Sequence, residues 1–322
     1  MYLNNKKLFL AGATGLVGSA ILKYIIANCP GTRIKAVYHE RQPFIEHDNI
    51  DYVHVNLFDL DECRAAVAGC DCAVMVAAVT ENAYTFTHGR GLSNDNIAMN
   101  MKMLEAFLLE GVERVIYIGS STIYQEREGF IKEDDLDYNK DPYAAYFNLG
   151  WSIRFVEKLC GYWHKTYGKD MIVVRASNVF GPYAKFHPKT SNFIPALVRK
   201  GVDKMDPFVV WGGPDVTRDV IYSEDFAEAI ITILNSDIKF DVFNVGSGVA
   251  IKVSEVVASV LKHCNYQPRI QYDSTQPTTI AYRALDCAKL KQALGWSPKH
   301  TIDDGIKETI DWWGQNKGWW TR

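Results

Sequence analysis

Three glycines near the start of the chain have the spacing of a loop that binds phosphate groups. Gly12, Gly15 and Gly18 follow the short apolar run Lys7–Ala11 and precede the amphipathic stretch Ser19–Asn28, an order that predicts a strand, a turn and a helix. The first glycine allows the tight turn, the second lets the backbone approach a pyrophosphate, and the third lets the helix lie close to the strand. Free N–H groups at the helix start would then face the phosphates. The motif therefore predicts a dinucleotide site.

The end of the second predicted strand bears on which dinucleotide this site takes. Sites for NAD usually place an acidic residue there, and it binds the ribose. Tyr38 and His39 occupy this position and Arg41 follows, so the missing carboxylate and the nearby cation favour the 2′-phosphate of NADP. The alternative is that Glu40 binds the ribose of NAD while Arg41 is a solvated loop residue. We expect NADP and keep NAD as the alternative.

Further dinucleotide contacts are expected from the loops that follow the next strands. Asp59 and Leu60 lie just past the third predicted strand, where they are well placed to reach an adenine. The full set of expected cofactor contacts is Gly12, Thr14, Gly15, Leu16, Val17, Gly18, Tyr38, His39, Arg41, Asp59, Leu60, Ala77, Ala78 and Asn96.

A run of hydroxyl side chains, which includes Ser120 and Thr122, follows the fifth predicted strand. A hydroxyl at the carboxyl end of a central strand in an open α/β sheet faces the ligand crevice. Ser120 and Thr122 are therefore candidate catalytic residues, and Ser120 would hydrogen-bond a substrate oxygen at the reacting carbon. The alternative is that Ser120 is a turn residue that satisfies only the backbone.

Strands and helices must alternate through the first half of the chain to place these residues. The predicted strands are Lys7–Ala11, Arg33–His39, Tyr52–Asn56, Ala73–Val79, Arg114–Gly119 and Met171–Arg175. The predicted helices are Ser19–Asn28, Leu60–Ala68, Asn96–Glu110 and Leu149–Tyr167. This alternation implies βαβ units with right-handed crossovers. We expect an α/β fold, a Rossmann doubly wound parallel sheet with a smaller α+β C-terminal lobe.

The regular alternation ends near Asn178, where glycine, proline and aromatic residues become frequent. We expect residues 1–178, with about 216–246, to form the dinucleotide-binding domain, because the predicted helix Ser223–Leu234 and strand Val242–Val245 return to it. Residues 179–215 and 247–322 would form the second lobe.

Composition excludes several classes of protein. Hydrophobic residues make up 48% and charged residues 23% of the chain, with a net charge of −3, so neither a nucleic acid nor an anionic membrane is an expected partner. No apolar run is long enough to span a bilayer, and the polar start Met1–Lys7 is not typical of a signal peptide. Seven scattered cysteines without zinc-ligand spacing predict a cytoplasmic protein with no metal site.

Several motifs occur in order along nearly the whole chain and carry a resemblance to a known family. They are the glycine motif GATGLVG, the segment SSTIY, Asn178-Val-Phe-Gly-Pro182, Asn192-Phe-Ile-Pro195, Arg218-Asp219 and Leu294-Gly295-Trp296. As a set, they resemble the extended short-chain dehydrogenase/reductases, a group of nucleotide-sugar epimerases, dehydratases and reductases. Within that group the chain looks most similar to the GDP-L-fucose synthases.

The resemblance implies that the second lobe binds a nucleoside-diphosphate sugar, and specifically a GDP-linked one. Cations near a pyrophosphate would make strong charge-assisted contacts, and an aromatic side chain could lie near the base. The implied substrate contacts are Asn178, Asn192, Lys200, Trp211, Arg218 and Arg283.

The family's chemistry depends on Tyr-x-x-x-Lys at the start of the long helix, and this chain departs from that pattern. Gap-free spacing to Gly181-Pro182 places Leu149 at the Tyr position and Ile153 at the Lys position. If the pattern is instead aligned with Tyr143 at the Tyr position, Phe147 stands at the Lys position. Leu and Ile cannot exchange protons.

Two further departures concern the groups that perform epimerisation in the fucose synthases. Thr122 replaces the Cys of that pattern, and Asn192 replaces its His. The chain therefore lacks the groups that perform the 3,5-epimerase step in that pattern. At Leu149 and Ile153 it lacks the groups that take part in hydride chemistry.

Three interpretations remain open. In the first, the protein is a nucleotide-sugar oxidoreductase or epimerase with another acid: Tyr146 lies one helical turn before Leu149, and Tyr143, Tyr124 and His187 are alternatives. In the second, it is a catalytically silent paralogue that binds both ligands in a regulatory or structural role. In the third, the scaffold serves an unrelated use. Members of the family commonly dimerise through the long helix, which implies a homodimer.

Overall fold

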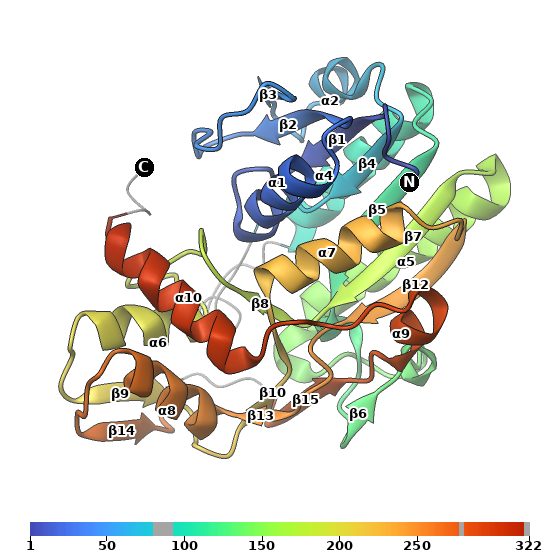
Figure 1. Cartoon of the computed structure of the whole chain (residues 1–322). Coiled ribbons are helices and arrows are strands. Elements are labelled where there is room, and N and C mark those ends of the chain that lie inside the picture. Colours follow the sequence, from blue (N-terminus) through green and yellow to red (C-terminus); the bar gives the residue numbers. More distant parts are fainter. Residues whose placement is uncertain (80–92, 277–279, 319–322) are drawn as a thin grey trace.

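The central sheet of the computed structural model is parallel and doubly wound (Figure 1). The structure describes residues 1–79, 93–276 and 280–318. Within these residues, the sheet order is β12 (Phe240–Val245), β7 (Asp170–Ala176), β5 (Arg114–Ser120), β4 (Cys72–Met75), β1 (Lys7–Ala11), β2 (Arg33–Tyr38) and β3 (Ile50–His54). The order reverses between β1 and β4, so a crevice for ligands is expected at the carboxyl ends of these two strands. The predicted α/β fold class is confirmed.

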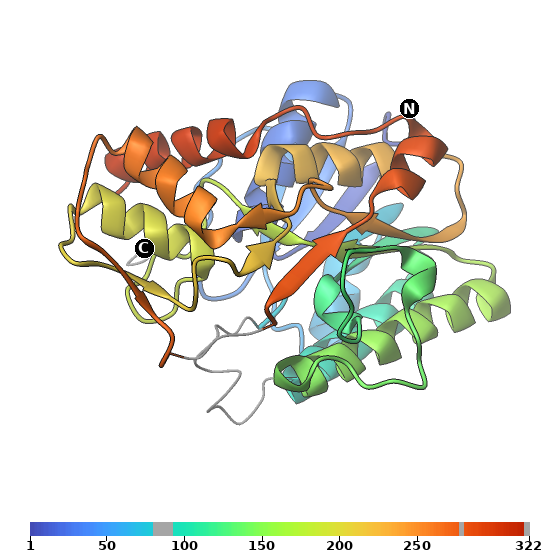
Figure 2. The same cartoon turned by 90° about the horizontal axis from the view of Figure 1, so that it is seen from below.

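Helices cover both faces of this sheet, as the views in Figures 1 and 2 show. One face carries α1 (Leu16–Asn28) and α7 (Ser223–Leu234), whereas α2 (Leu60–Val67), α4 (Ser93–Leu109) and α5 (Phe147–Tyr167) cover the other. The chain returns to the central sheet after the segment 179–215, because β12 pairs with β7 and α7 packs on the face of the sheet. The domain boundaries themselves stay a prediction.

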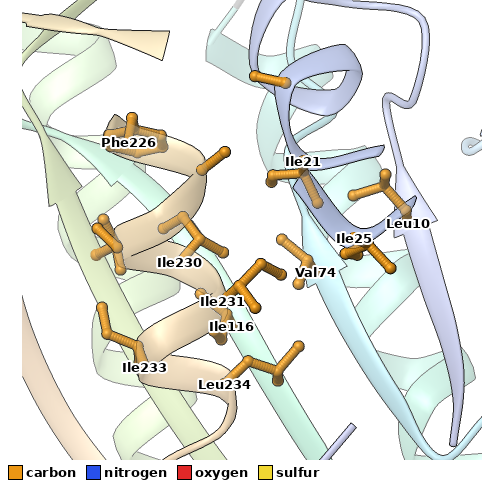
Figure 3. Close-up of a cluster of buried hydrophobic side chains, with 14 of the residues drawn as sticks. Leu10, Ile21, Ile25, Val74, Ile116, Phe226, Ile230, Ile231, Ile233 and Leu234 are labelled. Atoms are coloured by element: carbon orange, nitrogen blue, oxygen red, sulfur yellow. The ribbon is translucent and has the colours of Figure 1, made fainter. Parts of the chain in front are cut away.

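Branched aliphatic side chains form the core beneath α1 and α7. Figure 3 shows Ile21 and Ile25 of α1 facing Ile230 and Ile231 of α7, over Val74 of the sheet. Strands buried on both faces are continuous apolar runs, which is why the sequence pattern predicted these strands.

A separate core lies in the C-terminal part of the chain, at the lower left of Figure 1. We call this cluster, which includes Phe186, Phe208, Val257 and Trp313, the C-terminal core. Around it lie α6 (Phe193–Val202), β9 (Phe208–Trp211), α8 (Val253–His263), β14 (Ile270–Asp273) and α10 (Ile302–Gln315). The ring of Trp313 stacks on Phe186 with centroids 4.4 Å apart.

Among the described residues, six short strands form two further sheets. They are β6 (Phe130–Ile131), β8 (Asn178–Phe180), β10 (Thr217–Arg218), β11 (Val220–Tyr222), β13 (Ile251–Lys252) and β15 (Tyr282–Leu285). The strand orders are β13-β10-β15-β6 and β11-β8. A further short helix, α9 (Ala288–Leu294), places Leu290 in the core beneath α1 and α7.

Among the helices that the structure describes, none combines the length and the apolarity needed to cross a membrane. The same part of the chain contains no group of His, Cys, Asp and Glu side chains arranged to hold a metal ion.

His300 ties the segment before α10 to α7 and makes stability depend on pH. Its Nδ1 lies 2.9 Å from a carboxylate oxygen of the buried Asp225. Burial acts to lower the pKa of His300, but the hydrogen bond and the charge of Asp225 outweigh it and raise the pKa. A group whose pKa is raised by folding stabilises the folded state. This contribution is fully present below the unfolded-state pKa of about 6.5 and is lost as pH rises through the folded-state pKa.

We therefore expect the free energy of unfolding to fall as pH rises from about 6.5. Urea unfolding at a series of pH values checks this, and the His300→Gln variant should show a flatter dependence. An unchanged slope in that variant would mean that another group titrates.

Candidate functional site

The glycine loop between β1 and α1 leaves no room for side chains at two of its positions. Gly12 has a φ of 81°, and a Cβ there would lie 2.8 Å from the backbone nitrogen of Ala77. A Cβ on Gly18 would lie 2.2 Å from the carbonyl oxygen of Gly12. Both glycines are therefore required by the packing of the loop, α1 and the end of β4.

Gly15 differs, because packing inside the protein does not require it. A Cβ there would meet only the Gly12 oxygen, at 3.5 Å, which is ordinary contact. Gly15 is the N-cap of α1, no side chain caps the helix, and the first turn has no acidic residue. The first N–H groups of a helix lack intrahelical acceptors, so the open space and the donors fit an anionic pyrophosphate.

Arg41 reaches from the loop after β2 to this glycine loop. Its Nη1 donates to the carbonyl oxygen of Thr14 at 3.3 Å, and burial lowers its pKa. Glu40 is exposed, and the ring of His39 stacks on that of His54 with centroids 5.5 Å apart. The guanidinium of Arg41 thus contacts the glycine loop at which the phosphate groups are predicted to bind.

Two other predicted cofactor residues hold backbone in place. An oxygen of Asp59 accepts hydrogen bonds from the N–H groups of Asp61 and Glu62 at 2.9 and 3.0 Å, so Asp59 caps α2. The amide of Asn96 in α4 accepts from the N–H of Val79 at 2.9 Å and donates to its carbonyl at 3.0 Å. Asn96 thereby fixes the segment after β4 that contains Ala77 and Ala78.

Ser120 lies at the end of β5, where sequence analysis expected it. Its hydroxyl oxygen accepts a long hydrogen bond of 3.3 Å from the N–H of Thr122, as the turn interpretation requires, but its proton can still be donated to a ligand. The Thr122 Oγ1 is buried and has no hydrogen-bond partner among the described residues. Ser120 thus keeps a proton for donation at the carboxyl edge of the sheet, and the nearby hydroxyl of Thr122 is buried there. We call the segment that contains Ser120 and Thr122 the hydroxyl segment.

The first turns of α5 lie against this segment and present aliphatic side chains. Ile153 is 7% exposed, and its Cγ2 would lie 3.0 Å from a Cβ on Gly119. Leu149, one turn earlier, is partly buried against the same core. A Cβ on Gly150 would lie 2.8 Å from the Thr122 carbonyl oxygen. The surface of α5 next to the hydroxyl segment therefore has no group that can exchange a proton at residues 149 and 153.

Two arginines and a tyrosine form a polar group beside the hydroxyl segment. Arg218 and Arg283 are register partners on the paired strands β10 and β15. Arg283 is 3% exposed, donates to the carbonyl of Ser121 at 3.1 Å, and has no partner for its Nε among the described residues. Burial lowers the pKa of Arg283 to about 10, partly offset by the nearby phenol of Tyr146. Burial also lowers the pKa of Arg218, again against the effect of Tyr146.

The hydroxyl of Tyr124, one of the alternative acids, is engaged in a buried hydrogen-bond network. This hydroxyl is fully buried, donates to Asn244 at 2.6 Å and accepts from Arg175 at 2.8 Å. Arg175 in turn pairs with Glu157 of α5. Burial raises the pKa of Tyr124, so this side chain is part of a structural network.

The remaining predicted substrate residues occupy two places. The amide nitrogen of Asn178 donates to the carbonyl of Asp219 at 2.9 Å, next to Arg218 in the chain. Lys200 of α6 donates to the carbonyl of Val209 at 2.6 Å, and burial lowers its pKa. Trp211, at the end of the same strand β9, is 45% exposed. Asn192 is the exposed N-cap of α6.

Sequence reasoning assigned no role to Asp219, which shapes the loop after β12. This carboxylate is 1% exposed and accepts hydrogen bonds from Ser247, Gly248 and Leu285, and burial raises its pKa. The only sequence signal was its place in the Arg218-Asp219 motif.

Comparisons with known proteins identify the family and the fold of the chain. Residues 8–246 match the model of the NAD dependent epimerase/dehydratase family. The chain is 28% identical to a GDP-L-fucose synthase of Sinorhizobium fredii over 97% of this chain and 96% of that protein. It is 26% identical to a dTDP-glucose 4,6-dehydratase of Streptomyces niveus over 98% and 94% of the two chains. A solved UDP-glucose 4-epimerase of Thermotoga maritima has the same fold, with a TM-score of 0.85 and 18% identity over 96% and 99% of the chains.

Proposed function

Since the chain belongs to the NAD dependent epimerase/dehydratase family, we propose that it binds NADP and a nucleoside-diphosphate sugar, with GDP as the nucleotide, and modifies the sugar with Tyr146 as the acid. The family comprises proteins that act on nucleotide sugars, and the finer parts of this proposal depend on particular residues.

The observation that carries the proposal is the burial of Arg283 beside Arg218. Two guanidinium groups on neighbouring strands repel each other, and the hydrogen bonds of Arg283 go to backbone carbonyls. Burial lowers the pKa of Arg283, and the nearby phenol of Tyr146 offsets this only in part. A diphosphate would supply negative charge here through charge-assisted hydrogen bonds.

NADP is supported by the fit of the glycine loop and by Arg41. The loop has open space at Gly15, no side chain among the described residues caps the N–H groups at the start of α1, and Arg41 donates to the carbonyl of Thr14. When bound, the cofactor would supply or accept a hydride.

Tyr146 is the acid that the site supports best in place of Leu149. Its phenol lies near the guanidinium groups of Arg218 and Arg283, where the diphosphate is proposed to bind. Ser120 and Thr122 would donate hydrogen bonds to the substrate oxygen with which Tyr146 exchanges a proton.

A second candidate, a silent paralogue that binds both ligands, is favoured by a specific observation. Ile153 is buried against Gly119, and Leu149 packs on the same core. These residues are part of the packing, so their replacement of Tyr and Lys leaves no defect in the fold.

One set of measurements separates the two candidates. The purified protein is titrated with NADPH, NADH, GDP and UDP by calorimetry, and turnover is followed with GDP-4-keto-6-deoxymannose and a panel of other nucleotide sugars. The proposal expects tight NADPH and GDP binding with turnover of at least one sugar. Binding without turnover across the panel would favour the silent paralogue, and failure to bind any dinucleotide would contradict both.

We also propose a homodimer formed through α4 and α5. Leu109, Phe155 and Tyr162 are 53%, 48% and 53% exposed on these helices, and Phe155 and Tyr162 are two turns apart on one face. An exposed apolar face of this kind marks an interaction site, and two such helix pairs can form a four-helix bundle. The cytoplasmic location expected from the sequence stays a prediction.

Phe155→Glu is expected to give a monomer, because burying a carboxylate in an apolar interface is costly. Light scattering after size exclusion measures the mass. Ile270→Glu, at an exposed apolar position on β14, is the matched control and should stay dimeric. A wild-type monomer at all concentrations would contradict the proposed dimer.

A further inference from the structure

An aromatic stack connects the loop after β2 with the C-terminal part of the chain. The ring of Phe44 stacks on that of Tyr183, with centroids 4.9 Å apart and planes 21° from parallel. Tyr183 in turn contacts Trp312 of α10, with centroids 4.9 Å apart. Tyr183 has a φ of 65°, a conformation that residues other than glycine seldom adopt, so surrounding contacts must hold it there.

This stack is one of several contacts that attach the loop 39–49 to the rest of the protein. The hydroxyl of Tyr52 in β3 donates to the carbonyl of Ile45 at 2.8 Å, and Arg41 donates to the carbonyl of Thr14 at 3.3 Å. Phe44, between Arg41 and Ile45, packs against the C-terminal core. Only two residues separate Arg41 from Phe44, so the placement of the Arg41 guanidinium is connected through this short segment to the ring of Tyr183.

The C-terminal core also contacts the glycine loop directly. Leu16, the first residue of α1, packs against the same core as Phe44. The core thus touches the two segments between which a dinucleotide's adenosine would lie, the helix start on one side and the Arg41 loop on the other.

We propose that Phe44 is a positioning residue for recognition of the 2′-phosphate, because its stacking on Tyr183 holds Arg41 beside the glycine loop. This inference rests on the proposed use of NADP. A loop that is already ordered loses little entropy on binding, whereas a released loop would have to be ordered again each time Arg41 pairs with the phosphate. Only ligands with a 2′-phosphate form that pair, so loss of the stack should weaken them selectively.

The test compares two small probes, adenosine 2′,5′-bisphosphate and 5′-AMP, by calorimetry on the full-length protein. Phe44→Ala is expected to weaken the bisphosphate about 10-fold, the scale of one charge-assisted hydrogen bond, and to leave 5′-AMP binding nearly unchanged. Phe44→Leu keeps most of the side-chain volume but lacks the ring, so it should weaken bisphosphate binding as Phe44→Ala does. It replaces Phe44→Ala in the test if that variant does not fold. Phe44→Tyr and Tyr183→Phe retain both rings and should bind like the wild type.

A double variant shows whether the effect acts through Arg41. Adding Phe44→Ala to Arg41→Ala should cause no further loss of bisphosphate affinity. Suppose that the wild type prefers the bisphosphate. If the folded Phe44 variants then lose affinity for both probes equally, or keep the same preference, the inference is overturned and the NADP proposal stands. A wild type without preference for the bisphosphate would overturn the NADP proposal and this inference with it.

Discussion

Gly18→Ala is expected to lower the free energy of unfolding by about 3 kcal/mol, whereas Gly15→Ala should leave it nearly unchanged, although both variants lose dinucleotide binding. A Cβ on Gly18 would lie 2.2 Å from the Gly12 carbonyl oxygen, so α1 must shift from the loop. A Cβ on Gly15 would meet that oxygen at 3.5 Å, and the φ of Gly15 is −86°, which any residue adopts. The alanine methyl would instead occupy the space through which a pyrophosphate approaches.

Urea unfolding gives the stability of each variant, and quenching of protein fluorescence by NADPH gives the affinity. Gly213→Ala, where a Cβ would meet no atom within 4 Å, is the control and should match the wild type in both. If Gly15→Ala binds NADPH as tightly as the wild type does, the phosphates do not lie at Gly15 and the proposed cofactor position is wrong.

The sequence predicted the fold well because the sheet leaves a strong signal in its strands. The central residues of β1 and β7, 8–11 and 171–174, are buried and form apolar runs, as expected of strands covered on both faces. The helices between the strands carry amphipathic or apolar patterns and have ordinary lengths. Strand ends were less predictable. The apolar run Ala73–Val79 forms a strand only as far as Met75, because Asn96 holds the residues beyond it through both backbone groups of Val79.

The candidate site was only partly predictable, because its groups meet through tertiary contacts. The position of Ser120 follows from the end of a strand, which a local pattern shows. The approach of Tyr146 to Arg218 and Arg283 depends on how β10 and β15 pair beside α5, and no periodicity in the sequence records this. Tyr124 shows the opposite case: next to the hydroxyl run it looked available, but its hydroxyl is bonded to Arg175 and Asn244.

The stack of Phe44 on Tyr183 escaped sequence analysis for a related reason. The two residues are far apart in the chain, and neither belongs to a periodic element. Loop residues of this kind carry no pattern that predicts a partner, whereas the structure shows the pair directly.

Tyr146→Phe is expected to lower kcat/KM at least about 100-fold with whichever nucleotide sugar the wild type converts, the scale of a lost general acid or base. The substitution removes one hydroxyl and keeps the ring, so packing against Tyr143, whose ring centroid is 5.9 Å away, is retained. Leu149 and Ile153 have no exchangeable protons and cannot replace the phenol. The affinity for GDP should change little, because Arg218 and Arg283 keep their positions on β10 and β15.

Tyr143→Phe is the matched control, since Tyr143 also lies near Arg218 and loses the same hydroxyl. Steady-state kinetics over a pH range, with GDP affinity measured in parallel, distinguish a chemical role from a binding role: loss of the acid lowers kcat, whereas loss of a sugar contact raises KM. Equal losses in the two variants would show that both phenols merely shape the pocket. Turnover that persists in Tyr146→Phe would show that another group acts as the acid. Ser120 and Thr122 would be tested next, because their hydroxyls lie at the carboxyl edge of the sheet beside the first turn of α5.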